Sequence, residues 1–101
     1  MVNQSVLEIA KRYIENIPQN LGLQKAYLFG SYAKGNQNPD SDIDIAIILS
    51  NIDNFYDTQM LLMRLRRDID LRIEAHHIAA KDFNENNPLA CEIQRTGIKI
   101  F

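Results

Sequence analysis

The chain has 101 residues, of which 46% are apolar and 24% charged, and its formal net charge is −2. These values are typical of one soluble globular domain with a modest core, and they exclude a basic surface for general nucleic-acid binding. The single cysteine, Cys91, has no partner for an internal disulfide, and the charged N-terminal segment is neither a signal peptide nor a membrane span. We therefore expect one domain over residues 1–101, in the cytoplasm.

The first half of the chain predicts one helix and two strands. Apolar residues at spacings of three and four over residues 2–17 predict an amphipathic helix, which Pro18 ends. The apolar run 26–29 predicts a short buried strand, and the Gly-, Asn- and Pro-rich segment 35–41 predicts a loop. A second, strongly apolar strand is expected over residues 42–50.

The second half predicts two more helices and two more strands. Residues 55–67 are rich in good helix formers and end in arginines, which suit a helix C-terminus. Residues 69–74 alternate apolar and charged side chains and predict a third strand. Asn87 can cap a helix over residues 88–97, and a short strand over residues 98–101 follows. The fold class is therefore α/β (α+β), with a small mixed sheet of three to four strands flanked by helices.

Acidic side chains gather on one face of the predicted second and third strands. Successive side chains on a strand point to opposite faces, so Asp42 and Asp44 share one face, and Asp70 and Glu74 share one face of the third strand. Neighbouring carboxylates beside an apolar core repel each other and raise each other's pKa. A divalent cation bound between them removes this repulsion. Magnesium prefers carboxylate oxygens and phosphates, and two such ions about 4 Å apart can support nucleotidyl transfer.

A Gly-Ser pair precedes the two aspartates by ten residues. Gly30 allows the backbone to approach a ligand closely, and Ser31 offers a hydroxyl and a main-chain N–H at the expected start of a short helix. These groups predict a phosphate-binding turn beside the carboxylates.

The segment from Gly30-Ser31 to Asp42 and Asp44 resembles the signature of the DNA polymerase beta-type nucleotidyltransferase superfamily. The short chain resembles the minimal nucleotidyltransferase branch of that superfamily. The later segments IDLRIE and NPLACEIQRTGIKIF are also similar to the family, so the resemblance covers nearly the whole chain.

The resemblance implies a site for a nucleoside triphosphate such as ATP and for two Mg²⁺ ions. Gly30 and Ser31 would hold the phosphates, and Asp42, Asp44 and a third carboxylate would hold the metal. Asp70 matches the third position best, and Glu74 is its competitor.

One position departs from the family pattern, and this changes which residue we expect to contact the triphosphate. Position 32 is Tyr where many members have a basic residue, so Lys34 would take more of the triphosphate contact.

The resemblance also implies a partner, because nothing in the chain is left over to bind an acceptor. Minimal members are commonly paired with a small helical protein of the HEPN class, as toxin and antitoxin. We expect transfer of AMP from ATP to a hydroxyl on such a partner; the chain is expected to assemble with this HEPN-type protein or as a homo-oligomer. The alternatives are a non-catalytic module that masks a toxin and a transferase acting on a small molecule or an RNA end.

Several of these residues also have a simple structural interpretation. The aspartates could belong to an ordinary turn and strand start, although a turn does not require the upstream Gly-Ser pair. Asp70 could pair with Arg72 on the surface, and Lys34 could be a solvated loop lysine. His76 and His77 could bind metal, but we expect them to be exposed or hydrogen-bonded in a loop after the third strand.

Overall fold

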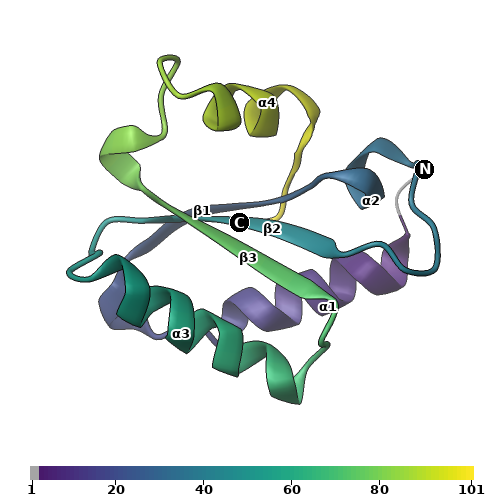
Figure 1. Cartoon of the computed structure of the whole chain (residues 1–101), viewed down its shortest axis with the longest axis horizontal. Coiled ribbons are helices and arrows are strands. Elements are labelled where there is room, and N and C mark those ends of the chain that lie inside the picture. Colours follow the sequence, from purple (N-terminus) through teal and green to yellow (C-terminus); the bar gives the residue numbers. More distant parts are fainter. Residues whose placement is uncertain (1–2) are drawn as a thin grey trace.

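The computed structural model describes residues 3–101, which form one four-stranded mixed sheet with helices on both faces (Figure 1). The helices are α1 (Gln4–Glu15), α2 (Ser31–Lys34), α3 (Phe55–Leu65) and α4 (Pro88–Thr96), and the strands are β1 (Leu23–Phe29), β2 (Ile43–Leu49), β3 (Ile73–Ala79) and β4 (Ile98–Lys99). The strand order is β3-β2-β1-β4; β1 runs antiparallel to β2 and β4, and β2 runs parallel to β3. The predicted fold class is confirmed, while the helical prediction for Val2 lies outside the described residues.

Asparagine side chains begin the three longer helices. Asn3, Asn54 and Asn87 each accept two hydrogen bonds from backbone N–H groups of the first helical turn, which have no partner within the helix. The cap predicted at Asn87 is therefore confirmed.

Two apolar clusters hold the sheet between its helices. On one face, α1 and α3 cover the side chains of Ile43, Ile45 and Ile47 of β2. On the other face, α4 packs through Ile93 against Ala46 and neighbouring apolar side chains. Because β2 is buried on both faces, its sequence is a continuous apolar run in which the polar Asp44 is conspicuous.

The third strand lies further along the chain than the sequence predicts. Residues 69–72 form a turn, and the strand begins at Ile73. The turn is stabilised locally, because the Asp70 carboxylate accepts a hydrogen bond from the backbone N–H of Arg72. Leu71, whose apolar character supported the predicted alternation, is 68% exposed. His76 and His77, expected in a loop, are therefore part of β3.

No helix within residues 3–101 is both long enough and apolar enough to cross a lipid bilayer.

Candidate active site

The Asp-x-Asp pair stands at the start of β2, on the sheet face that α4 covers. Asp44 is level with Phe29 of β1 and with Glu74 of β3. Asp42 comes directly before the strand and is exposed, whereas Asp44 is half-buried. The neighbouring isoleucines 43 and 45 point into the opposite apolar core, which fixes the direction of both carboxylates.

Gly30 brings the end of β1 against Asp44. Its φ angle is 75°, and a Cβ added there would lie 2.3 Å from Oδ2 of Asp44. A side chain at this position would therefore meet both an unfavourable backbone conformation and a carboxylate oxygen. The Gly-Ser turn and the aspartate pair, ten residues apart in sequence, are in direct contact in the structure.

Glu74 is the acidic side chain of β3 that joins the aspartates. Parallel pairing places Asp44 and Glu74 side by side on one face of the sheet. The pKa of Glu74 is raised, first through a hydrogen bond shared with Asp42, then by partial burial and by the charge of Asp42. Glu74 and the aspartate pair thus form a cluster of like charges, which a bound cation would stabilise.

Asp70 lies in the turn before β3 and faces a different partner. Its two carboxylate oxygens accept hydrogen bonds from Nε and Nη2 of Arg72, at 3.0 and 2.9 Å. These bonds to the Arg72 guanidinium lower the pKa of Asp70. The guanidinium also donates to the hydroxyl of Tyr32, at 3.2 Å, which ties the turn to α2. The structure therefore brings Glu74, and not Asp70, to the aspartate pair.

Ser31 and Lys34 are both on α2, but only Ser31 adjoins the carboxylates through Gly30. Ser31 is the first residue of α2, and its hydroxyl makes no hydrogen bond to any residue of the segment 3–101. Lys34 instead pairs with Glu92 of α4, with 3.1 Å between Nζ and Oε1. Both of these side chains are largely exposed, so the pair holds Lys34 only weakly.

His76 is a neighbour of Asp44 that the sequence interpretation did not select. Its Nε2 lies 3.1 Å from Oδ1 of Asp44, and its ring packs edge-on against Phe29 with centroids 5.0 Å apart. The imidazole can therefore orient the aspartate from the neighbouring strand. The signal for this role was the alternation along β3, which puts His76 on the same face as Glu74, level with Ala46 and next to Asp44.

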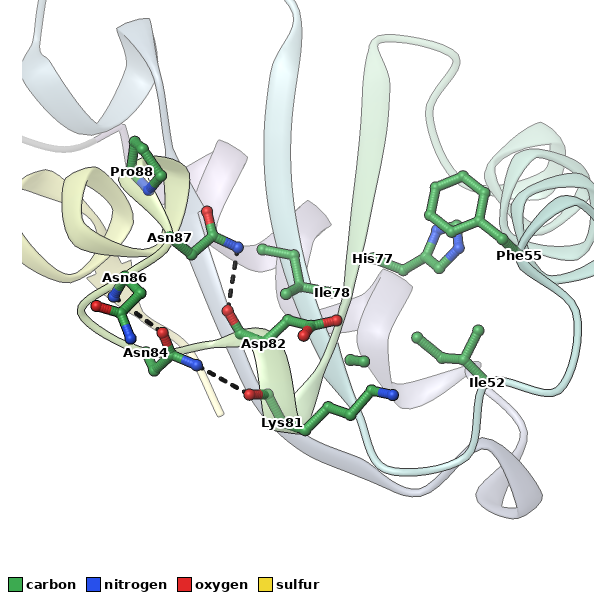
Figure 2. A pocket seen from close by; sticks show the side chains of 11 residues that line it. Ile52, Phe55, His77, Ile78, Lys81, Asp82, Asn84, Asn86, Asn87 and Pro88 are labelled. Carbon is green, nitrogen blue, oxygen red and sulfur yellow. Dashed lines mark hydrogen bonds between the residues drawn. The ribbon is translucent and has the colours of Figure 1, made fainter.

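A well-formed pocket lies away from these carboxylates. It has a volume of about 740 Å³ and extends along the C-terminal half of β3, between the start of α3 and the segment before α4 (Figure 2). Neither aspartate of the pair lines it. Over residues 3–101, no three His, Cys, Asp or Glu side chains form a group that could hold a metal ion in this conformation.

A mixed sheet that brings a Gly-Ser turn against an Asp-x-Asp pair defines the class of protein, a nucleotidyltransferase. The chain belongs to the polymerase beta nucleotidyltransferase family, whose sequence model matches residues 11–101.

Comparisons with individual proteins agree with this family. The chain is 44% identical over 68 residues to the protein adenylyltransferase MntA of Shewanella oneidensis, an alignment that covers 63% of this chain and 47% of the relative. The chain thus spans about half the length of the curated relative it matches.

Solved structures of similar fold include a toxin–antitoxin complex with AMP-PNP, with a TM-score of 0.63 and 26% identity over 99% of this chain and 73% of that chain. They also include a Sulfolobus solfataricus protein assigned as a nucleotidyltransferase, with a TM-score of 0.63 and 26% identity over 77% of this chain and 70% of that chain.

Proposed function

We propose that this chain transfers AMP from ATP to a hydroxyl group on a partner protein, and that it is the antitoxin of a pair with a small helical HEPN-type protein. The observation that supports the proposal is the contact between Gly30 and Asp44, because the turn that we propose to bind phosphate then lies next to a carboxylate. The similarity to an adenylyltransferase and to a toxin–antitoxin complex with an ATP analogue supports the choice of ATP and of a protein acceptor. The cytoplasm is the compartment we infer for this pair, from the composition.

The reaction would be an in-line displacement at the α-phosphorus of ATP. The acceptor oxygen forms a bond to this phosphorus, the bond from the phosphorus to the bridging oxygen breaks, and pyrophosphate leaves. The hydroxyl proton passes to a nearby carboxylate or to water. Gly30 and the N–H and hydroxyl of Ser31 would bind phosphate oxygens, while the exposed Lys34 can leave Glu92 to contact the triphosphate.

The carboxylate oxygens of this cluster are suitable ligands for Mg²⁺. Asp42, Asp44 and Glu74 supply the oxygen ligands that Mg²⁺ prefers, and their mutual repulsion favours a cation between them. Asp42 and Glu74 are exposed, so their side chains can rotate towards an ion within nanoseconds. Two ions bound here would neutralise the phosphates and increase the reactivity of the acceptor hydroxyl.

Transfer is tested with the chain copurified with its native partner. After incubation with Mg²⁺ and ATP labelled at the α-phosphate, we expect label on the partner and an increase in its intact mass by whole AMP units. Chelation of the metal should abolish the label, and ATP labelled at the γ-phosphate should give none. Label from the γ-phosphate, or label that persists without divalent metal, would refute the proposal.

The third carboxylate is identified by comparing two variants. Glu74→Gln should lower transfer by about a hundredfold, because it removes a metal ligand, whereas Asp70→Asn should leave transfer within about threefold of the native rate. An inactive Asp70→Asn protein together with an active Glu74→Gln protein would assign the ligand to Asp70 instead.

The Glu74→Gln and Asp70→Asn variants should also differ in how their melting temperatures depend on pH. The pKa of Glu74 is raised in the folded state, so the native chain loses stability as pH rises through that pKa. Glu74→Gln removes this loss and should melt at a higher temperature than the native chain at pH 7, with the difference vanishing in acid. The pKa of Asp70 is lowered, so its contribution is present above the unfolded pKa and is lost as pH falls. Asp70→Asn should therefore melt at a lower temperature at pH 7, and thermal melts across this pH range measure both effects.

A further inference from the structure

Strand β3 has one free edge along its length. It is the outermost strand of the sheet and pairs only with β2 among the residues that the structure describes. In Figure 1 it crosses in front of the other strands, with α3 beneath it. Its sequence, IEAHHIA, has a single charged residue and no proline, so it lacks the usual features that prevent an edge from pairing with another strand.

The alternation of the parallel ladder shows which backbone groups face this edge. Ile43 donates its N–H to the carbonyl of Arg72, so residue 72 and every second residue after it face β2. The backbone groups of Ala75 and His77 therefore face outwards. The carbonyl of Ile73, which also faces outwards, already accepts a hydrogen bond of 2.9 Å from Nη1 of Arg66.

Apolar side chains of α3 stand exposed next to this edge. Seven large apolar side chains are exposed within residues 3–101, and four of them belong to α3: Phe55, Tyr56, Met60 and Met63. Tyr56, Met60 and Met63 are spaced by four and three residues, so they form one stripe along the helix. Its neighbours on the β3 side are Phe55 and Gln59, while Thr58 and Leu62 point into the core.

Two pockets lie between α3 and β3. One, of about 250 Å³, is lined by Met63 and Gln59 of α3 and by the first half of β3. The other is the large pocket of Figure 2, where His77 packs against the ring of Phe55 with centroids 4.0 Å apart. His77 is only 5% exposed, and its ring lies close to the backbone of Phe55.

We propose that this surface is the interface with a second copy of the chain, with β3 paired antiparallel to β3 of that copy and the exposed stripe of α3 packed against its counterpart. Antiparallel self-pairing is a two-fold arrangement in which the same surface serves both copies. It satisfies the outward N–H and C=O groups of Ala75 and His77, and it covers the apolar side chains of α3.

The charges of α3 favour the antiparallel arrangement over a parallel one. Asp53 and Asp57 lie at the start of the helix, and Arg64 and Arg67 lie at its end. Met60 lies midway between these groups. Two antiparallel copies place the acidic start of each helix beside the basic end of the other, whereas parallel copies would place like charges together.

The mass of the native chain in solution tests the interface. Light scattering coupled to size-exclusion chromatography should give twice the chain mass of 11.6 kDa. Met63→Lys places a charge on the exposed stripe and should weaken the dimer by about tenfold or more. The matched control is Leu89→Lys, which changes an exposed apolar residue of α4 on the other face of the sheet and should leave the dimer intact.

Amide hydrogen exchange distinguishes strand pairing from other modes of association. In the native dimer, the amides of Ala75 and His77 should be protected along with those of Glu74 and His76. In Met63→Lys, only the second pair, which faces β2, should remain protected. A monomeric native chain, an undiminished dimer in Met63→Lys, or a dimer with unprotected Ala75 and His77 amides would each overturn the proposal. These readouts do not depend on the transferase reaction.

Discussion

Replacing Asp44 with Asn is expected to reduce AMP transfer by about a thousandfold while leaving the chain folded, because the amide is a much weaker ligand for magnesium than the carboxylate. The substitution preserves the shape of the side chain and keeps an oxygen that can contact Nε2 of His76. It also removes one charge from a cluster in which Glu74 already has a raised pKa. The melting temperature should therefore be equal to or higher than that of the native chain.

Transfer from α-labelled ATP and a thermal melt of each protein test this prediction. The control is Asp40→Asn, which changes an exposed aspartate of the loop before β2 and should leave both measurements unchanged. Native levels of label in the Asp44→Asn protein would refute the catalytic role of this residue. If label is lost but the partner remains neutralised, the chain masks its partner by binding, and transfer is not what silences the toxin.

The sequence was sufficient to predict that the Gly-Ser turn and Asp44, on β1, α2 and β2, lie next to each other. This part of the site is local in sequence: Gly30, Ser31, Asp42 and Asp44 lie within fifteen positions, and a single loop joins the strands that carry them. Each side chain is placed by backbone geometry alone, through the positive φ of Gly30 and the alternation along β2. Such features depend on residue type and spacing, which a sequence displays directly.

The half of the site on β3 could not be predicted with the same accuracy. The alternation of residues 69–74 indicated a strand, but the side chain of Asp70 forms a turn with Arg72 that delays the strand until Ile73. Whether residues 69–72 form a strand or a turn depends on the hydrogen bonds of Asp70 alone. Because β3 pairs parallel with β2 after a helical crossover, its register against Asp44 is set by packing between distant segments. The sequence therefore did not predict that Glu74 and His76 would be the side chains of β3 next to the aspartates.

Replacing Gly30 with Ala is expected to impair both folding and transfer, because this residue holds the phosphate-binding turn against the carboxylates. The backbone of Gly30, with φ 75° and ψ −152°, lies in a region that essentially only Gly adopts, and it costs a residue with a Cβ about 1–3 kcal/mol. The new methyl group would also lie 2.3 Å from Oδ2 of Asp44, so the carboxylate or the turn must move. A displacement of this size at a reacting centre can reduce the rate about a hundredfold.

Gly35→Ala is the control for a positive φ angle without the contact; its ψ angle of 16° places it in the left-handed helical region, whereas ψ is −152° at Gly30. The φ angle of Gly35 is 77°, and nothing lies within 4 Å of an added Cβ. We expect the Gly35→Ala protein to lose about 1–2 kcal/mol in urea titrations, the cost of a left-handed conformation, and to keep transfer within about threefold of the native rate. The Gly30→Ala protein should lose more stability than this control and most of its activity. If the Gly30→Ala protein transfers AMP as fast as the Gly35→Ala protein, the approach of Gly30 to Asp44 contributes nothing to the reaction, and the phosphate-binding turn would then have to lie elsewhere.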